Sequence, residues 1–211
     1  TGGFGSNLEM RKQYNPMMDE KILSTNSVGS TGDGITMARL VGANVAGMHA
    51  VAGNAPYLPD VPPINQFSGP DELKQGRCAL AQPWLWVNHE GKRFFNESRG
   101  AVFVDVYNAM TSAGGVLYTI FDQSMIDDLI NKGAVLPFNA IVLAGVPLKA
   151  LPKTLEMGYE RGWAFKADTV KELAQQIGVP PENLESSMKR VNEFAKTGVD
   201  EEFSRKPEHL R

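Results

Sequence analysis

The feature that most constrains the fold of this chain is a proline-rich stretch over residues 52–70. Five of these nineteen residues are proline, with glycine and asparagine between them. Proline lacks a backbone N–H and fixes φ, so neither a helix nor an inner strand continues through such a density of proline. The stretch therefore predicts a connector or a loop laid over a site. It divides the chain into a first domain over residues 1–54 and a second over residues 55–211.

The first of these domains contains two glycine-rich turns. Residues 1–5 read TGGFG, and residues 31–34 read TGDG. Glycine lets backbone N–H groups approach an anion, so Thr1, Gly2 and Gly3 could cradle a phosphate. The first turn does not complete the GxGxxG dinucleotide motif and no strand is apparent before it, so a plain turn is the more common reading of this pattern.

The second turn precedes a predicted helix. Asp33 is a suitable N-cap, and apolar residues follow it at roughly helical spacing. Gly32, Asp33 and Gly34 therefore form either a capping loop or a turn whose N–H groups and carboxylate meet a polar ligand at the start of a helix.

In the second domain, residues 83–99 predict a β-hairpin. Residues 84–87 form an apolar-aromatic run, residues 88–91 are turn-forming or polar, and residues 92–95 are cationic and aromatic. Two short runs on either side of a glycine-containing turn are typical of a hairpin.

The side chains of this hairpin suggest different environments. We expect its two tryptophans in the core, and Lys92 and Arg93 on a solvated edge. At the exit of the hairpin Arg99 follows Glu97 by two residues. A surface ion pair between the two would explain this arrangement, and so would a functional site that uses the charge of Arg99.

Other segments show helical or strand patterns. Helices are predicted over residues 6–12, 102–113, 124–132, 151–158, 170–178 and 180–198, and strands over residues 116–121 and 163–167. The clearest signal is a capping box from Thr169 to Glu172. The apolar run 116–121 is typical of a central strand covered on both faces, and residues 200–205 predict a charged, solvated tail. Several helices, few strands and no strict βαβ alternation indicate an α+β fold.

Composition excludes several classes of function. A net charge of −3 argues against a nucleic-acid-binding surface, and the sequence has no apolar run of the length that spans a membrane. Cys78 is the only cysteine, so we expect it as a buried filler rather than a nucleophile. The three histidines lack the spacing of a metal site, and none is predicted.

Five motifs together resemble one protein family. TGGFG, TNSVGSTGDGITMARLVGA, WVNHEGKRFFNES, GGVLYTIFDQS and ADTVKELAQQIGVPPENLESSMKRVNEF occur in this order over nearly the whole chain. Each motif alone is weak, but their order and spacing are similar to those of the fumarate reductase and succinate dehydrogenase flavoprotein family. That family includes urocanate reductase-like enzymes and 3-ketosteroid dehydrogenases.

The resemblance implies a place within a larger protein. In this family a two-lobed FAD-binding domain is interrupted by a capping domain that closes over flavin and substrate. Residues 1–54 would be part of the FAD-binding domain and residues 55–211 the capping domain. The cofactor would be FAD, contacted by Thr1, Gly2, Gly3, Gly32, Asp33 and Gly34. Without the remainder of its FAD-binding domain, the chain is not expected to retain FAD or activity.

The resemblance also implies a reaction. Hydride would pass between flavin N5 and an activated carbon–carbon double bond of a small unsaturated substrate, with Arg99 as the proton donor and Glu97 and Arg77 as substrate-binding residues. A non-catalytic module from a degenerate family member, retained for partner or ligand binding, is the alternative. A cytoplasmic location is favoured, and a periplasmic one stays open because a targeting signal would lie upstream of Thr1.

Overall fold

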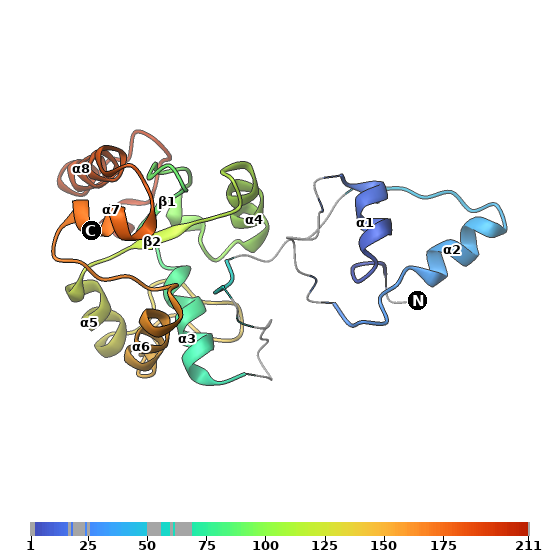
Figure 1. Ribbon diagram of the computed structural model, residues 1–211, viewed down its shortest axis with the longest axis horizontal. Helices are drawn as coiled ribbons and strands as arrows, with labels where there is room; N and C mark the ends of the chain where they lie inside the picture. The colour runs from blue at the N-terminus through green and yellow to red at the C-terminus, as the bar shows by residue number, and fades with distance from the viewer. Residues whose placement is uncertain are drawn as a thin grey trace. The chain divides into compact units, whose positions relative to one another are not determined.

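The computed structural model describes residues 3–16, 18, 24, 26–49, 56–59, 61 and 69–210. The chain divides into two compact units, Thr1–Ala52 and Gly53–Arg211 (Figure 1). The boundary predicted at residue 54 lies outside the described residues, as do Thr1 and Gly2. The two units are described separately below.

The first unit contains two short helices. α1 (Leu8–Tyr14) begins after Asn7, whose side-chain oxygen accepts a hydrogen bond from the backbone N–H of Met10 at 3.0 Å. α2 (Asp33–Leu40) begins one residue earlier than predicted, because Gly32 and not Asp33 is its N-cap. Gly32 has a φ of +83°, a conformation that glycine adopts without strain, so the cap falls on the glycine.

The second unit is built around a small antiparallel sheet. β1 (Leu85–Val87) pairs with β2 (Tyr118–Ile120) in the register Leu85↔Ile120, Trp86↔Thr119 and Val87↔Tyr118. Within the predicted hairpin only the isolated bridge Val87↔Arg93 forms. The predicted return strand therefore pairs with β1 at one position, and the strand that pairs with β1 along its length lies about thirty residues later. β2 is half-buried, so the prediction of a strand covered on both faces is wrong.

Six helices surround this sheet in the described part of the second unit. They are α3 (Asp71–Leu80), α4 (Phe103–Ser112), α5 (Gln123–Asn131), α6 (Leu151–Arg161), α7 (Val170–Ile177) and α8 (Pro181–Thr197). Two 3₁₀ segments are also present. η1 (Glu97–Arg99) follows the hairpin, and η2 (Pro207–His209) lies near the C-terminus. α3 packs on α6, α7 packs on α8, and α8 reaches β1 (Figure 1). A helix-rich unit with a small sheet agrees with the predicted α+β class.

The helix caps explain why several of these helices were predictable. Thr169 accepts a hydrogen bond from the N–H of Glu172 at 3.2 Å, and Gly178 ends α7 at a φ of +72°. α5 is capped by Asp122, whose carboxylate accepts a hydrogen bond from Met125 N–H at 2.9 Å. Residues 163–167 form no strand. α3 was not predicted at all.

The core of the second unit consists of separate apolar clusters. One joins α3, α5 and α6 around Cys78, Leu129 and Leu151, and another joins the sheet to α7 and α8 around Leu85 and Leu184. The two tryptophans of the hairpin are buried, as predicted. Cys78 is fully buried, and burial raises the pKa of its thiol to about 12. A thiol with this pKa is not ionised near neutral pH, so Cys78 is a packing residue.

Candidate functional site

The two glycine-rich turns meet in the first unit. The N–H of Gly32 donates a hydrogen bond to the carbonyl of Gly3 at 2.8 Å, and the side-chain amide of Asn7 donates to the carbonyl of Thr31 at 2.9 Å. Gly32 has a φ of +83°, which strains any residue with a Cβ, and a Cβ here would also lie 2.5 Å from Met10 Sδ, so glycine is favoured at this point. Two motifs separated by about thirty residues therefore form one local structure.

The start of α2 has the chemistry that a phosphorylated cofactor requires. Asp33 is exposed at the first position of this eight-residue helix, and within the described residues no acceptor contacts the backbone N–H of Asp33 or Gly34. Free N–H groups at a helix start favour anions, and an exposed carboxylate accepts hydrogen bonds from hydroxyl groups. The N–H groups of Asp33 and Gly34 and the carboxylate of Asp33 thus have the chemistry expected of a contact to a phosphate or a hydroxyl group.

Arg99 lies at the end of η1, on the surface of the second unit. Its Nε donates to Asp105 Oδ2 at 2.6 Å, and its Nη2 contacts the same oxygen. The Arg99 side chain is 57% exposed and that of Asp105 is 33% exposed. The predicted ion pair between Arg99 and Glu97 is therefore wrong: the partner is Asp105, in the first turn of α4. The guanidinium of Arg99 is held in one orientation while much of it stays open.

Glu97 has a different environment. Its side chain is fully buried, and Arg93 binds both of its carboxylate oxygens, with Nε to Oε1 at 2.8 Å and Nη2 to Oε2 at 2.6 Å. The backbone N–H of Trp86 donates to Glu97 Oε1 at 3.3 Å. A carboxylate that is enclosed and bonded in this way offers no surface to a substrate. The predicted substrate contact of Glu97 is therefore wrong, and the role of this side chain is structural.

Glu97 belongs to a buried charge cluster that we define as Arg93, Glu97, Asp200 and Arg205. Arg93 also binds Asp200, with Nη1 to Oδ1 at 2.8 Å and Nη2 to Oδ2 at 2.6 Å. The backbone N–H of Arg205 donates to Asp200 Oδ2 at 2.9 Å, and Arg205 Nη1 donates to the carbonyl of Trp84 at 3.2 Å. All four side chains are buried.

The charge cluster corrects two predictions. Arg93 is not on a solvated edge, and residues 200–205 are not a solvated tail throughout, because Asp200 and Arg205 are 5% and 3% exposed. The cluster fixes the hairpin exit to the end of the chain. It thereby sets the position of η1, which carries Arg99.

The charge cluster predicts how stability responds to acid. Burial alone would raise the pKa of Asp200, but hydrogen bonds from Arg93 and from the backbone of Arg205 and Phe203 outweigh this effect and hold the pKa well below its usual value. An unfolded aspartate has a pKa of about 3.9. The stabilisation is therefore complete above about pH 4 and is lost as the pH falls below this value.

Urea unfolding at a series of pH values tests this dependence. When the pH is lowered from neutral to acidic, the urea midpoint of the wild type is expected to decrease by more than that of Asp200→Asn. The asparagine at position 200 cannot titrate, and this variant is already less stable than the wild type at neutral pH. Parallel pH profiles of the two proteins would contradict the role given to Asp200.

Arg77 is also buried. Its guanidinium lies 3.7 Å from the centre of the Tyr57 ring and 4.6 Å from that of Phe138. Its Nε donates to the carbonyl of Pro56 at 3.1 Å, and burial lowers its pKa. With 1% of its surface exposed, Arg77 is not placed to bind a substrate. The structure gives it a role in joining α3 to the segment around Pro56.

Across the residues that the structure describes, no three side chains of histidine, cysteine, aspartate or glutamate are grouped in a way that could hold a metal ion. Among the same residues, no helix has both the length and the apolar character needed to cross a bilayer.

Comparison with known proteins identifies the family. A family described as FAD binding domain matches residues 1–210. Urocanate reductase of Eggerthella lenta is 33% identical over 204 residues, which are 96% of this chain and 29% of that protein. Vinyl phenol reductase of Lactiplantibacillus plantarum is 27% identical over 220 residues, which are 100% of this chain and 42% of that protein.

A solved structure gives the same result. The 3-ketosteroid delta1-dehydrogenase from Sterolibacterium denitrificans aligns with a TM-score of 0.60 and 25% identity over 97% of this chain and 34% of that one. The chain thus spans 29% to 42% of the length of these three proteins. The match to the family covers both units and confirms the resemblance seen in the five motifs. The chain belongs to the FAD binding domain family of flavoproteins.

Proposed function

We propose that this chain is part of an FAD-dependent oxidoreductase that transfers hydride between flavin N5 and an activated carbon–carbon double bond of a small molecule. The observation that carries the proposal is the family match over residues 1–210. Two relatives are named for the reduction of urocanate and of vinyl phenol. In each compound a carbon–carbon double bond is conjugated with an unsaturated group, which is the class of substrate that we propose.

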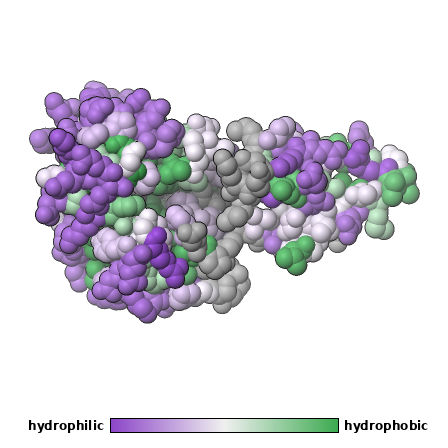
Figure 2. Space-filling model, viewed as in Figure 1, coloured by the Kyte–Doolittle hydropathy of each residue, from purple (hydrophilic) through white to green (hydrophobic). Residues whose placement is uncertain are grey.

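In this proposal residues 1–54 belong to an FAD-binding domain whose remainder lies outside the chain. α2 buries none of its residues, and Val28, Leu40 and Val41 are between 81% and 91% exposed. Hydrophobic side chains are visible on the surface of this unit (Figure 2). A helix without a buried face has little to stabilise it alone. The exposed apolar residues support a larger domain that covers them, with Gly3, Gly32, Asp33 and Gly34 facing the cofactor.

Residues 55–211 would then form the capping domain, and Arg99 would be its catalytic residue. Bound FAD supplies the hydride exchange. Arg99 holds a proton on its guanidinium, and its positive charge attracts an anionic or polarised substrate. Asp105 keeps the guanidinium in one orientation through Nε and Nη2. The charge cluster fixes the segment from which Arg99 extends.

Assay of the intact protein tests this function. Supplied with FAD and a reduced artificial electron carrier, it is expected to reduce one or more alkenes that carry an adjacent carbonyl, carboxylate or aromatic ring. An intact protein that binds FAD but neither reduces such alkenes nor oxidises their saturated forms would favour the alternative, a non-catalytic module. The burial of Glu97 and Arg77 is compatible with that alternative, because two of the three expected active-site side chains are structural.

The chain alone is expected to bind FAD weakly. It contains one helix start and one pair of glycine turns from the proposed cofactor site, so most contacts to the cofactor would be missing. Equilibrium dialysis of the 211-residue chain against FAD should show no submicromolar binding, with ATP as the comparison ligand. Submicromolar retention of FAD would show that the chain holds a nearly complete cofactor site and would contradict the proposed division of the domain.

A further inference from the structure

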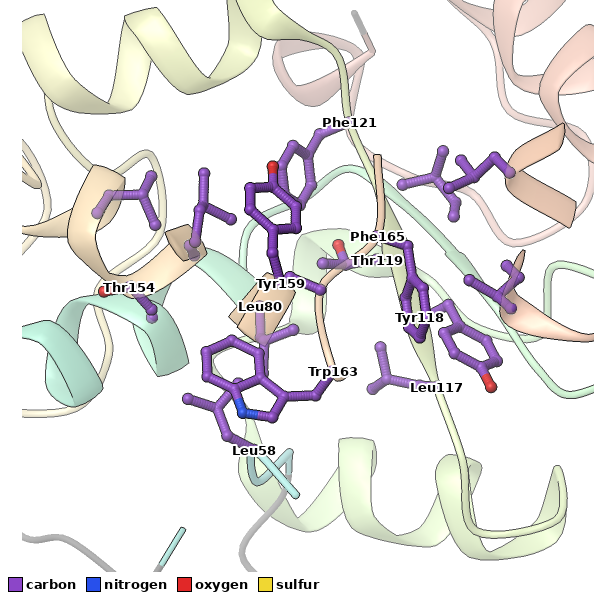
Figure 3. Close-up of a pocket in the computed structure, with 18 residues that line it drawn as sticks. Leu58, Leu80, Leu117, Tyr118, Thr119, Phe121, Thr154, Tyr159, Trp163 and Phe165 are labelled. Atoms are coloured by element: carbon purple, nitrogen blue, oxygen red, sulfur yellow. The ribbon is translucent and has the colours of Figure 1, made fainter. Parts of the chain in front are cut away.

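The exposed guanidinium of Arg99 lies outside the pocket that Figure 3 shows. This pocket of about 130 Å³ lies between β2, α3 and α6, and its wall includes Tyr159 and Trp163. Its described lining includes neither Arg99 nor the neighbouring Ser98. The walls of the pocket therefore do not hold Arg99, and the position of this residue depends on the short segment η1.

η1 consists of three residues, which form a single turn of 3₁₀ helix. The backbone N–H of Arg99 donates to the carbonyl of Asn96 at 3.0 Å. Hydrogen bonds of 3₁₀ type have poorer geometry than those of an α-helix, so a segment of this length depends on contacts with the rest of the unit. Ser98, which lies between the buried Glu97 and the exposed Arg99, makes two such contacts.

The hydroxyl group of Ser98 joins η1 to the C-terminal segment. Ser98 Oγ accepts a hydrogen bond from the backbone N–H of Lys206 at 3.0 Å and lies 2.9 Å from His209 Nδ1. A hydroxyl group has one hydrogen and two lone pairs, so Ser98 can bond both partners in either tautomer of the histidine. The partners follow Ser98 by 108 and 111 residues, so this one hydroxyl fixes two distant segments to each other.

A second contact of η1 reaches the same C-terminal segment. Asn96, the N-cap of η1, donates from Nδ2 to the carbonyls of Phe203 at 2.8 Å and Ser204 at 3.1 Å. Ser204 has a φ of +56°, in the left-handed region that a residue with a Cβ seldom adopts. Such a conformation costs free energy and persists where the surrounding contacts require it. The C-terminal segment therefore holds a strained residue at the point where it meets η1.

We propose that Ser98 is a positioning residue for Arg99, an inference that rests on the proposed function. Arg99 follows Ser98 directly, and its carbonyl accepts from the N–H of Val102, the N-cap of α4, at 2.8 Å. Asp105, which binds the guanidinium, lies in the first turn of α4. Loss of the Ser98 hydroxyl would release the backbone of Arg99 on the side of η1. A catalytic group that is misplaced by about 1 Å can lower the rate by about 100-fold.

The Nε–H signal of Arg99 in ¹H–¹⁵N spectra of the chain tests this placement without a cofactor. Arg99→Gln identifies the signal, and the bond from Nε to Asp105 Oδ2 at 2.6 Å should slow its exchange with water. Ser98→Ala is expected to move the signal and to speed its exchange by about fivefold, the factor that corresponds to one lost hydrogen bond. Ser98→Thr keeps the hydroxyl group and should retain the wild-type signal.

Ser187 provides a matched control for Ser98. It is also half-buried, and its hydroxyl donates to the carbonyl of Gly91 at 2.9 Å, across 96 residues of sequence. This bond joins α8 to the hairpin and does not involve η1. Ser187→Ala should therefore leave the Arg99 signal in place. An Arg99 signal that does not respond to Ser98→Ala, or that responds equally to Ser187→Ala, would overturn the proposal.

Turnover of the intact, FAD-loaded protein gives a second readout. Ser98→Ala should lower kcat of alkene reduction by about 10- to 100-fold. In an Arg99→Gln background the same substitution should cause no further loss, because a positioning residue acts through the group that it positions. Equal losses in both backgrounds would overturn the proposal. A wild-type protein that reduces no alkene would contradict the proposed function, and the Arg99 signal would then test separately whether Ser98 holds Arg99 in place.

Discussion

Replacing Arg93 with methionine is expected to lower the free energy of unfolding by about 3–5 kcal/mol. Arg93 binds both carboxylates of the buried charge cluster, and its side chain is 2% exposed. Without it, Glu97 and Asp200 remain buried with much of their charge uncompensated, which costs far more than a lost surface ion pair. Chemical unfolding followed by circular dichroism measures the change.

Arg190 provides a matched control for Arg93. Both guanidinium groups lie over the ring of Phe194, at 5.9 Å for Arg93 and 4.7 Å for Arg190. Arg190 binds acidic partners as well, but its side chain is 41% exposed. Arg190→Met should therefore cost less than about 1 kcal/mol. Similar losses in the two variants would show that burial of the cluster is not what stabilises this unit.

Replacing Arg99 with glutamine should lower the turnover of the intact, FAD-loaded protein by about 100- to 10,000-fold, the usual range for a lost general acid. Its FAD content should not change, because none of the proposed cofactor contacts involves η1. Steady-state alkene reduction and the flavin absorption spectrum measure the two quantities separately.

Lys92 is the matched control for Arg99. It lies in the hairpin that precedes η1, its side chain is 59% exposed, and its partner is the exposed Glu90 at 2.9 Å. Lys92→Gln removes one positive charge without touching the proposed site and should leave turnover within about threefold of the wild type. An Arg99→Gln protein with normal turnover would remove Arg99 from the mechanism and leave the family assignment in place.

The sequence was most informative where local signals determine structure. The capping box at Thr169 and the glycines at the ends of α7 and α8 act within one helical turn, so both helices could be predicted. α3 was missed although Pro70 and two acidic residues stand at its start, because the proline-rich stretch before it dominated the pattern. That signal was present, since proline and acidic residues favour helix starts.

The site was less predictable because its charges pair over long distances. Arg93 and Asp200 are 107 residues apart, and nothing in the local pattern of either residue indicates a partner. Two short runs around a glycine-containing turn predicted the hairpin, but they could not show that its return strand ends in a buried cluster. Arg99 and Glu97 are close in sequence, yet each has a different partner. Only the folded structure shows that the carboxylate of Glu97 is buried and structural while the guanidinium of Arg99 is exposed.

The most direct measurement of the proposed function is an anaerobic titration of the intact protein with its flavin reduced. Addition of an alkene conjugated with a carbonyl, a carboxylate or an aromatic ring is expected to restore the oxidised flavin spectrum, with one equivalent of saturated product for each flavin. Reduced flavin that persists in the presence of every alkene of this class would contradict the proposal that the protein transfers hydride to carbon–carbon double bonds.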